Sequence, residues 1–187
     1  MSRGHNDDVS SLRTPDQNPG WLSDDDLARV RANTPVLYVE AVPVRTDGRG
    51  RITEVGMLLR VSREGRMTRS VVSGRVLHGE AVRDALMRHL EKDLGPTAFP
   101  QVPMSITPFT VAEYFPWPGV SSYSDTRQHA VSLAYVVPVT GNCDPRQDAL
   151  ELTWMTPAEA VSETVSVEME GGRGRLMRLA LASVDAI

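Results

Sequence analysis

The spacing of apolar residues along this chain follows two different periods. Six segments are apolar runs or two-residue alternations rich in branched and aromatic side chains, which is typical of β-strands: 36–44, 51–61, 67–74, 109–115, 129–139 and 152–155. Between the third and the fourth segment the period changes to four, with apolar residues at 82, 86, 90 and 94. This spacing predicts one face of a helix over 79–94, which Gly95 and Pro96 end.

Polar residues at the ends of these segments predict the turns and the helix starts. Turns that contain glycine are expected at 46–50 and 62–65. Ser23 is placed to cap a short helix whose first turn holds three aspartates, and Thr156 before a proline is typical of another helix start. A last helix is expected over 171–182. The order strands, helix, strands, helix predicts an α+β (mixed α/β) layered domain.

Length and composition favour a single globular domain. The 187 residues suffice for one ordinary domain, and 41% hydrophobic with 24% charged residues is close to the average of soluble proteins. We expect this domain to occupy 21–187. Residues 1–20 are polar and offer little to bury, so they predict a disordered acidic tail.

Charge and cysteine content exclude several classes of protein. The net charge of −4 argues against a nucleic-acid polymer as partner. No apolar stretch approaches the ~18 residues of a membrane helix, and no secretory signal is visible at the start of the chain. Because Cys143 is the only cysteine, it has no intrachain disulfide partner, and we expect a cytoplasmic protein without a membrane partner.

A set of residues with defined spacing surrounds the predicted helix. Five residues separate Gly74 from Glu80, and seven more separate Glu80 from Arg88. Three further positions complete the pattern: Leu90, Asp93 and Gly95. This pattern resembles the Nudix box, and the order of strands and helix extends the resemblance to about residues 35–160. The chain is similar to a divergent branch of the Nudix hydrolase superfamily with a degenerate box, and its nineteen arginines against one lysine fit a GC-rich, actinobacterial genome.

The resemblance implies a fold, a reaction and a metal. It implies a Nudix-like α/β/α sandwich with a mixed sheet, and hydrolysis of a pyrophosphate linked to a nucleoside. In that superfamily Mg²⁺ or Mn²⁺ is held by carboxylates on one face of the box helix, where it neutralises charge and orients water. A homodimer is the expected assembly.

Three positions depart from the box, and two of them lie on the metal-binding face. His89 and Lys92 stand where the family has glutamates, and Pro96 replaces an apolar residue. Asp93 is the one carboxylate left of three, so it is the predicted metal ligand and metal binding is expected to be weak. Lys92 could point into solvent or hold a phosphate in place of the metal. His89 could be a hydrogen-bonded helix residue, or could share a softer metal with Asp93 one turn away.

Two other box residues match the family's supporting pair. An ion pair between Glu80 and Arg88 would fix the loop on the helix whether or not the protein is catalytic. With His89, Lys92 and Asp93 they form the predicted catalytic set, in which Asp93 is the metal ligand.

Arginines are the first group of candidate substrate contacts. Residues 45–75 contain eight arginines against three acidic residues. Of these, Arg60, Arg69 and Arg75 are predicted to border a ligand groove, because a guanidinium binds phosphate through two hydrogen bonds. The alternative is that hairpin arginines point into solvent, as strand alternation requires for some of them.

The loop 113–128 supplies the second group of candidates. Glu113 or Asp125 could be a further acidic residue of the site. Among the aromatic residues of the loop, Tyr123 is predicted to stack on a base, although these rings could instead anchor the loop on the core.

Two functions therefore remain open for this sequence. The first is a hydrolase of a nucleoside-diphosphate-linked compound with weakened or altered metal-dependent activity. The second is a non-catalytic Nudix-fold module that binds a ligand or another protein. The expected partner is a nucleotide-like small molecule, and the loss of two carboxylates favours the second function.

Overall fold

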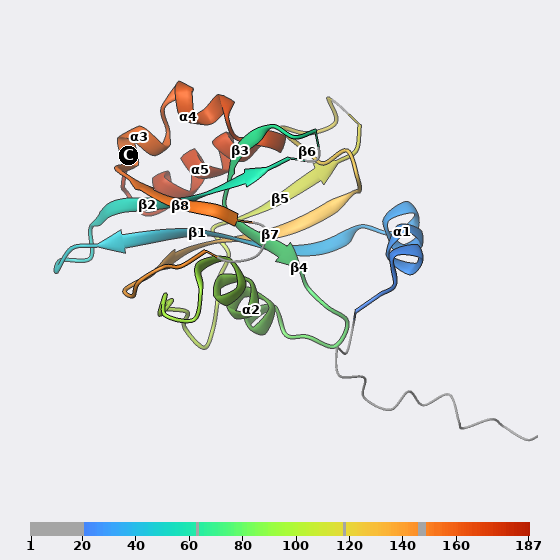
Figure 1. The fold of residues 1–187 in the computed structure, drawn as a ribbon, viewed down its shortest axis with the longest axis horizontal. Helices are drawn as coiled ribbons and strands as arrows, with labels where there is room; N and C mark the ends of the chain where they lie inside the picture. Colours follow the sequence, from blue (N-terminus) through green and yellow to red (C-terminus); the bar gives the residue numbers. More distant parts are fainter. Residues whose placement is uncertain (1–20, 63, 118, 146–148) are drawn as a thin grey trace, which may run out of the picture.

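A computed structural model describes residues 21–62, 64–117, 119–145 and 149–187 (Figure 1). The tail predicted at 1–20 lies outside the described residues. The helical elements are α1 (Asp24–Asn33), α2 (Val82–Leu94), α3 (Pro157–Ala160), α4 (Glu163–Val167), the 3-10 turn η2 (Glu170–Gly172) and α5 (Arg173–Ala182). The strands are β1 (Val36–Thr46), β2 (Ile52–Val61), β3 (Met67–Ser70), β4 (Val72–Arg75), β5 (Thr110–Phe115), β6 (Tyr123–Ser124), β7 (Ala130–Pro138) and β8 (Ala149–Met155).

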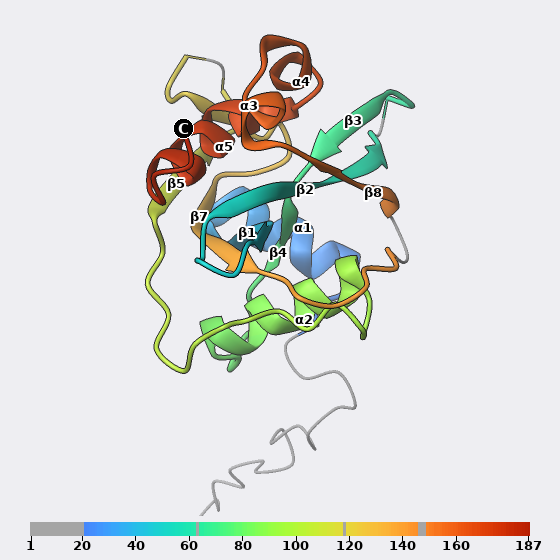
Figure 2. The same cartoon turned by 90° about the vertical axis from the view of Figure 1, so that its left-hand side faces the viewer.

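The strands form one curled mixed sheet between helices. Its main path runs β3-β2-β1-β7-β5-β6, with β4 joined to β1 and β8 joined to β2. The pairs β1–β7 and β5–β6 are parallel, and the other pairs are antiparallel. Both views show α2 on one side of the sheet and α3, α4 and α5 on the other (Figures 1 and 2). The fold class predicted from the sequence is therefore confirmed.

Strand β1 is buried on both faces because it separates two cores. Val42 and Val44 pack in the core that includes Leu176 and Leu181 of α5. The alternate residues of β1 pack in the other core, which includes Leu86, Leu90 and Leu94 of α2. The period-four residues of the sequence thus form the buried face of α2, as predicted. No helix in the described part of the chain is long and apolar enough to cross a membrane.

The sheet forks where β2 leaves β1. Near the hairpin, Val55 of β2 pairs with Val44 of β1. Further along, Leu58 to Val61 pair with β3 on one edge, and β8 occupies the other edge. At the same level β1 pairs with β4 instead. The predicted strand 67–74 is therefore two strands, because the chain passes from β2 to β1 at the buried Val71.

Glycine conformation moves two helix starts later than predicted. Helix α2 begins at Val82 rather than at 79, since Gly79 has φ 76° and the backbone N–H of Glu80 donates to Leu77 in a turn. Helix α5 begins at Arg173 because Gly171 and Gly172 have φ 67° and 86°, outside the helical region.

The other predicted helix starts are present. Ser23 caps α1, and Thr156 forms a capping box with Glu159 at the start of α3.

Candidate functional site

A bidentate ion pair fixes the loop before α2, which is the box helix, meaning the helix that carries the Nudix-box residues from Arg88 to Asp93. Arg88 donates from Nε to Glu80 Oε1 at 2.7 Å and from Nη2 to Oε2 at 2.8 Å. Glu80 Oε2 also accepts the backbone N–H of Leu77 at 2.9 Å, while Arg88 Nη2 donates to the Arg75 carbonyl at 3.0 Å. The Arg88 hydrogen bond holds the pKa of Glu80 below its usual value of 4.5. The pair therefore connects the loop to α2 and to the end of β4, and this role is structural.

His89 is packed under β4 as a neutral ring. Only 6% of the residue is exposed, and Nε2 donates to the Arg75 carbonyl at 3.0 Å. Burial lowers its pKa, so the uncharged ring predominates at neutral pH. A Cβ at Gly74 would lie 1.8 Å from the ring, so only glycine permits this packing. His89 is thus a hydrogen-bonded helix residue, which was one of the two interpretations of the sequence.

Asp93 is buried between two cationic side chains. The residue is 1% exposed, and its Oδ2 accepts from Arg60 Nη2 at 2.7 Å. Its Oδ1 lies 3.2 Å from Lys92 Nζ. The side chain of Lys92 is 26% exposed, so this lysine turns toward Asp93 rather than extending freely into solvent.

This arrangement does not fit a magnesium ion. Mg²⁺ requires several oxygen ligands at once. Both oxygens of Asp93 face cationic nitrogens, and His89 donates its Nε2 proton to a backbone carbonyl. Across the described ranges, no three His, Cys, Asp or Glu side chains are grouped closely enough to hold a metal. The residues on this helix therefore do not fit a divalent metal.

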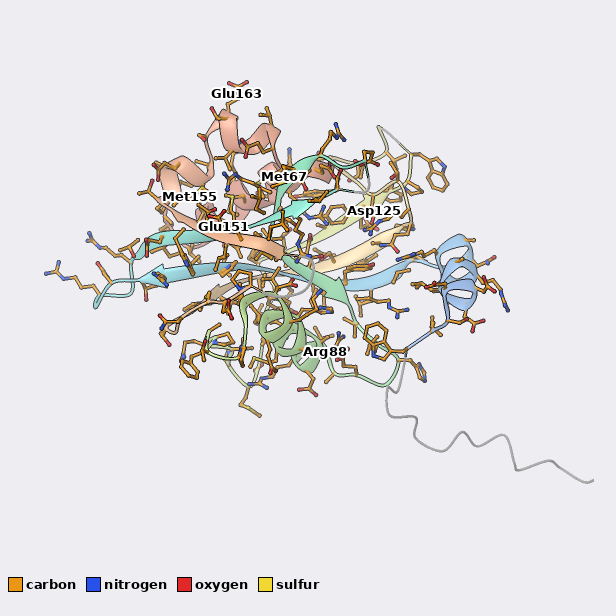
Figure 3. The ribbon with its side chains drawn as sticks, in the orientation of Figure 1. Met67, Arg88, Asp125, Glu151, Met155 and Glu163 are labelled. Carbon is orange, nitrogen blue, oxygen red and sulfur yellow. The ribbon has the colours of Figure 1, made fainter. Side chains whose placement is uncertain are left out.

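A cavity of about 550 Å³ lies beside the fork. The β2–β3 hairpin, the segment 124–127 and the start of α5 line it, together with Tyr38 of β1 and Ser73 of β4. Its charged lining combines five arginines with three carboxylates: Arg60, Arg66, Arg69, Arg127, Arg173, Glu64, Asp125 and Glu170. Figure 3 labels Asp125, which lines the cavity, and also labels Arg88 on α2, which lies on the other side of the sheet. The cavity is therefore rich in anion-binding groups.

Two of the arginines keep buried N–H groups without a partner. Arg60 uses Nη2 for Asp93, and Arg69 donates from Nε to Glu168 at 2.6 Å. Within the described part of the chain, Arg60 Nε and Arg69 Nη1 are buried and have no hydrogen-bond acceptor. A buried donor without an acceptor is costly, so these positions favour an anionic ligand.

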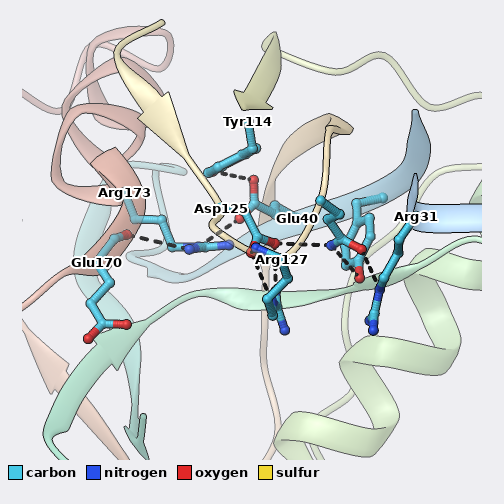
Figure 4. A network of polar contacts seen from close by, with 9 residues as sticks. Arg31, Glu40, Tyr114, Asp125, Arg127, Glu170 and Arg173 are labelled. Atoms are coloured by element: carbon cyan, nitrogen blue, oxygen red, sulfur yellow. Dashed lines mark hydrogen bonds and ion pairs between the residues drawn. The ribbon is translucent and has the colours of Figure 1, made fainter. Parts of the chain in front are cut away.

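A buried carboxylate supports the floor of the cavity (Figure 4). Glu40 is 1% exposed, and it accepts from Arg173 Nε at 2.9 Å and from the Tyr114 hydroxyl at 2.8 Å. Burial and the nearby Glu40 carboxylate raise the pKa of Tyr114, so the phenol stays protonated and donates. These contacts fix Arg173 at the edge of the cavity.

A second pair lies beside it. Asp125 accepts two hydrogen bonds from the Arg127 guanidinium, at 2.7 and 2.6 Å, one from the Arg127 backbone N–H at 3.1 Å, and one from Gln128 Nε2 at 3.0 Å. Gln128 also accepts from Arg31 of α1 at 2.8 Å, so α1 is tied to this wall.

Three of the predicted substrate residues lie at the cavity and three do not. Arg60, Arg69 and Asp125 line it. The side chain of Glu113 is mostly exposed and lies 3.9 Å from His129, away from the cavity lining. Arg75 is also absent from that lining, although its carbonyl accepts from the box helix.

The stacking role predicted for Tyr123 does not agree with its position. The residue is 9% exposed and belongs to the core that includes Leu176 and Leu181 of α5, which we call the α5-side core. Its ring centroid lies 5.3 Å from that of Tyr114. Phe115, from the same loop, stacks on His129 with 4.4 Å between centroids. These rings therefore anchor the loop, which was the alternative interpretation.

Sequence reasoning missed Glu40 and Arg173 as site residues. Glu40 interrupts the apolar run 36–44, and a lone carboxylate in a buried strand is the available signal. Its partner lies 133 positions away, so the pair itself could not be predicted.

Comparisons with known proteins place this arrangement among related folds. A family model described as a domain of unknown function, DUF4916, matches residues 17–186. A crystal structure described as a possible asymmetric diadenosine tetraphosphate hydrolase from Jonesia denitrificans is 56% identical, with a TM-score of 0.80 over 82% of this chain and 97% of that chain. The comparison with curated proteins gave no match.

More distant structures share the fold alone. The Nudix domain of Shewanella oneidensis NrtR, solved with ADP ribose, is 15% identical with a TM-score of 0.59, covering 87% of this chain and 99% of that chain. A Nudix hydrolase from Nitrosomonas europaea is 13% identical with a TM-score of 0.58, covering 82% and 90%.

Proposed function

Because this chain belongs to the DUF4916 family and to the Nudix superfamily, we propose that it binds a nucleoside-diphosphate-linked compound through the arginine-lined cavity. In this proposal metal-dependent hydrolysis is weak or absent. The observation that supports it most is the pair of buried guanidinium N–H groups, on Arg60 and Arg69, that have no acceptor in the described chain. Phosphate oxygens are suited to both.

The contacts of the individual residues support a separate role for each of them in this proposal. Arg69 and Arg60 bind phosphate oxygens, and Glu40 holds Arg173 so that its charge faces the same cavity. Asp93 orients Arg60 rather than a metal. Glu80 and Arg88 keep the box helix in place beneath them.

Hydrolysis is the second candidate, and one observation favours it. The relative that is 56% identical is described as a possible diadenosine tetraphosphate hydrolase. The test is an assay of this chain with diadenosine tetraphosphate and Mg²⁺ or Mn²⁺. Release of phosphate products that is abolished by Asp93→Asn would assign this reaction to the chain.

The sequence-based expectations of a cytoplasmic homodimer with no nucleic-acid partner are retained as part of the proposal. Light scattering tests the assembly directly: a dimer has twice the mass of the 20.5 kDa chain.

The binding proposal is tested by calorimetry with ADP-ribose in the presence of EDTA. We expect Arg69→Gln to weaken binding about tenfold or more, because a charge-assisted hydrogen bond to the phosphates is lost. The matched control is Arg49→Gln, which removes the same charge from the exposed hairpin turn at 46–50. No binding by the unmodified chain, or equal affinities of the two variants, would contradict the proposal.

A further inference from the structure

Hydroxyl groups are the second kind of side chain in the cavity. Six residues that line it end in a hydroxyl on serine or threonine: Ser62, Thr68, Ser70, Ser73, Ser124 and Thr126. A hydroxyl both donates and accepts, so this lining can bind phosphate oxygens and also the hydroxyl groups of a sugar. The arginines alone can donate hydrogen bonds but cannot accept one from a sugar hydroxyl.

The cavity offers almost no aromatic surface on which a base could stack. Every Phe, Trp and Tyr of the chain belongs to the described residues, and Tyr38 is the only one of them that lines this cavity. Its hydroxyl accepts from Gln128 Nε2 at 2.9 Å, and its ring packs against the α5-side core. An aromatic platform typically strengthens the binding of a base about tenfold or more. A base bound here would have no such platform.

Carboxylates on the cavity wall disfavour a ligand that consists of phosphate alone. Glu170 lies in the η2 turn, is partly exposed, and has its Oε1 3.3 Å from Arg66 Nη2. Asp125 lies across the cavity lining, paired with Arg127. A carboxylate repels phosphate but accepts hydrogen bonds from hydroxyl groups. The mixture of charges therefore fits a ligand that has both phosphates and hydroxyls.

We infer that the cavity recognises a phosphorylated sugar or polyol, through its phosphates and its hydroxyl groups, and does not recognise the base of a nucleotide. This inference rests on the proposed function, because it requires that phosphate bind to the arginines. A base attached to such a sugar extends out of the cavity.

Three compounds that differ by one part each test the inference by calorimetry in EDTA. Inorganic phosphate, ribose 5-phosphate and AMP add the sugar and then the adenine in turn. We expect ribose 5-phosphate to bind more than about threefold tighter than phosphate, and AMP to bind within about threefold of ribose 5-phosphate. AMP binding more than threefold tighter than ribose 5-phosphate would overturn the inference, and so would equal affinities of ribose 5-phosphate and phosphate.

A carboxylate variant gives an independent readout. Glu170→Gln removes a negative charge and weakens an acceptor at the cavity wall, so it should weaken ribose 5-phosphate binding about threefold or more while leaving pyrophosphate binding unchanged or stronger. The control is Glu163→Gln in α4, an exposed residue outside the cavity lining that Figure 3 labels. Equal weakening of both ligands by Glu170→Gln would contradict a role in sugar recognition.

Different results would contradict the proposed function and the inference about the sugar. If neither pyrophosphate nor ADP-ribose binds, the proposed function is wrong. If pyrophosphate binds and Arg69→Gln weakens it, but the sugar adds nothing or the adenine adds more than threefold, only the sugar inference is wrong.

Discussion

The box helix and the arginine-lined cavity use similar side chains in opposite ways. On the helix side, Glu80 meets Arg88, and Asp93 meets Arg60 and Lys92, so that each carboxylate faces cationic groups. In the cavity, buried guanidinium N–H groups remain without an acceptor in the described chain. In the region that resembles a catalytic motif the carboxylates of Glu80 and Asp93 are thus paired with cations, although Asp93 Oδ1 and His89 Nδ1 are buried without a hydrogen-bond partner among the described residues. The arginines that are suited to an anionic ligand lie next to it.

Arg60 belongs to both regions. It contacts Asp93 of α2 with one nitrogen, and it lines the cavity from the fork of the sheet. A degenerate motif can thus keep its structural half, the Glu80–Arg88 pair, while an arginine from a neighbouring strand pairs with the carboxylate that a metal would need.

Replacing Arg60 should have the largest effect, because this residue belongs to both regions. Arg60→Met leaves Asp93 buried with Lys92 as its remaining cationic neighbour, so we expect a loss of about 3 kcal/mol in the free energy of unfolding. Ligand affinity should fall as well. Urea denaturation and calorimetry measure the two effects. The matched variant is Arg69→Met, for which we expect a fall in ligand affinity with a smaller loss in the free energy of unfolding. Equal free energies of unfolding for the two variants would show that Arg60 does not stabilise the buried Asp93.

Gly74→Ala tests the packing of the helix side alone. The new Cβ would meet the His89 ring at 1.8 Å, so the ring or β4 must move, at a cost of about 2 kcal/mol. Urea denaturation measures this cost against Gly48→Ala, where nothing lies within 4 Å of the added Cβ. Adding His89→Ala to Gly74→Ala should recover part of the loss, and no recovery would count against the contact.

The Glu80–Arg88 pair should make a smaller contribution that depends on pH. Arg88 lowers the folded-state pKa of Glu80 below 4.5, so its stabilising effect is complete above that pH and is lost as the pH falls through the folded pKa. Glu80→Gln should cost about 1 kcal/mol at pH 7 and progressively less as the pH falls below 4.5 and through the folded pKa. Denaturation curves measured from pH 7 downward follow this cost, and a cost that does not change with pH would contradict the assignment.

Local patterns predicted the parts of this molecule that local physics determines. The period-four face of α2 is buried, and Ser23 and Thr156 cap their helices. The pair of Glu80 and Arg88 is also present, but it was implied by the resemblance to the Nudix box rather than by a local pattern. These outcomes depend on spacing within one element or on neighbouring segments.

The site could be predicted only in part, because distant segments make it. Arg60 meets Asp93 across 33 positions, since β2 leaves β1 at the fork. Tyr123 lies in a strand of two residues, which is too short for alternation to indicate its buried side. The fork and the position of α5 decide which arginines share a cavity, and neither follows from a local period.

The most direct test of the central claim is thermal unfolding with and without a divalent metal. A metal that binds only the folded chain raises the melting temperature by several degrees once its concentration exceeds the dissociation constant many times. We predict a shift of less than about 1 °C with millimolar MgCl₂, because Arg60 and Lys92 already face Asp93. A shift of several degrees that Asp93→Asn abolishes would contradict the account.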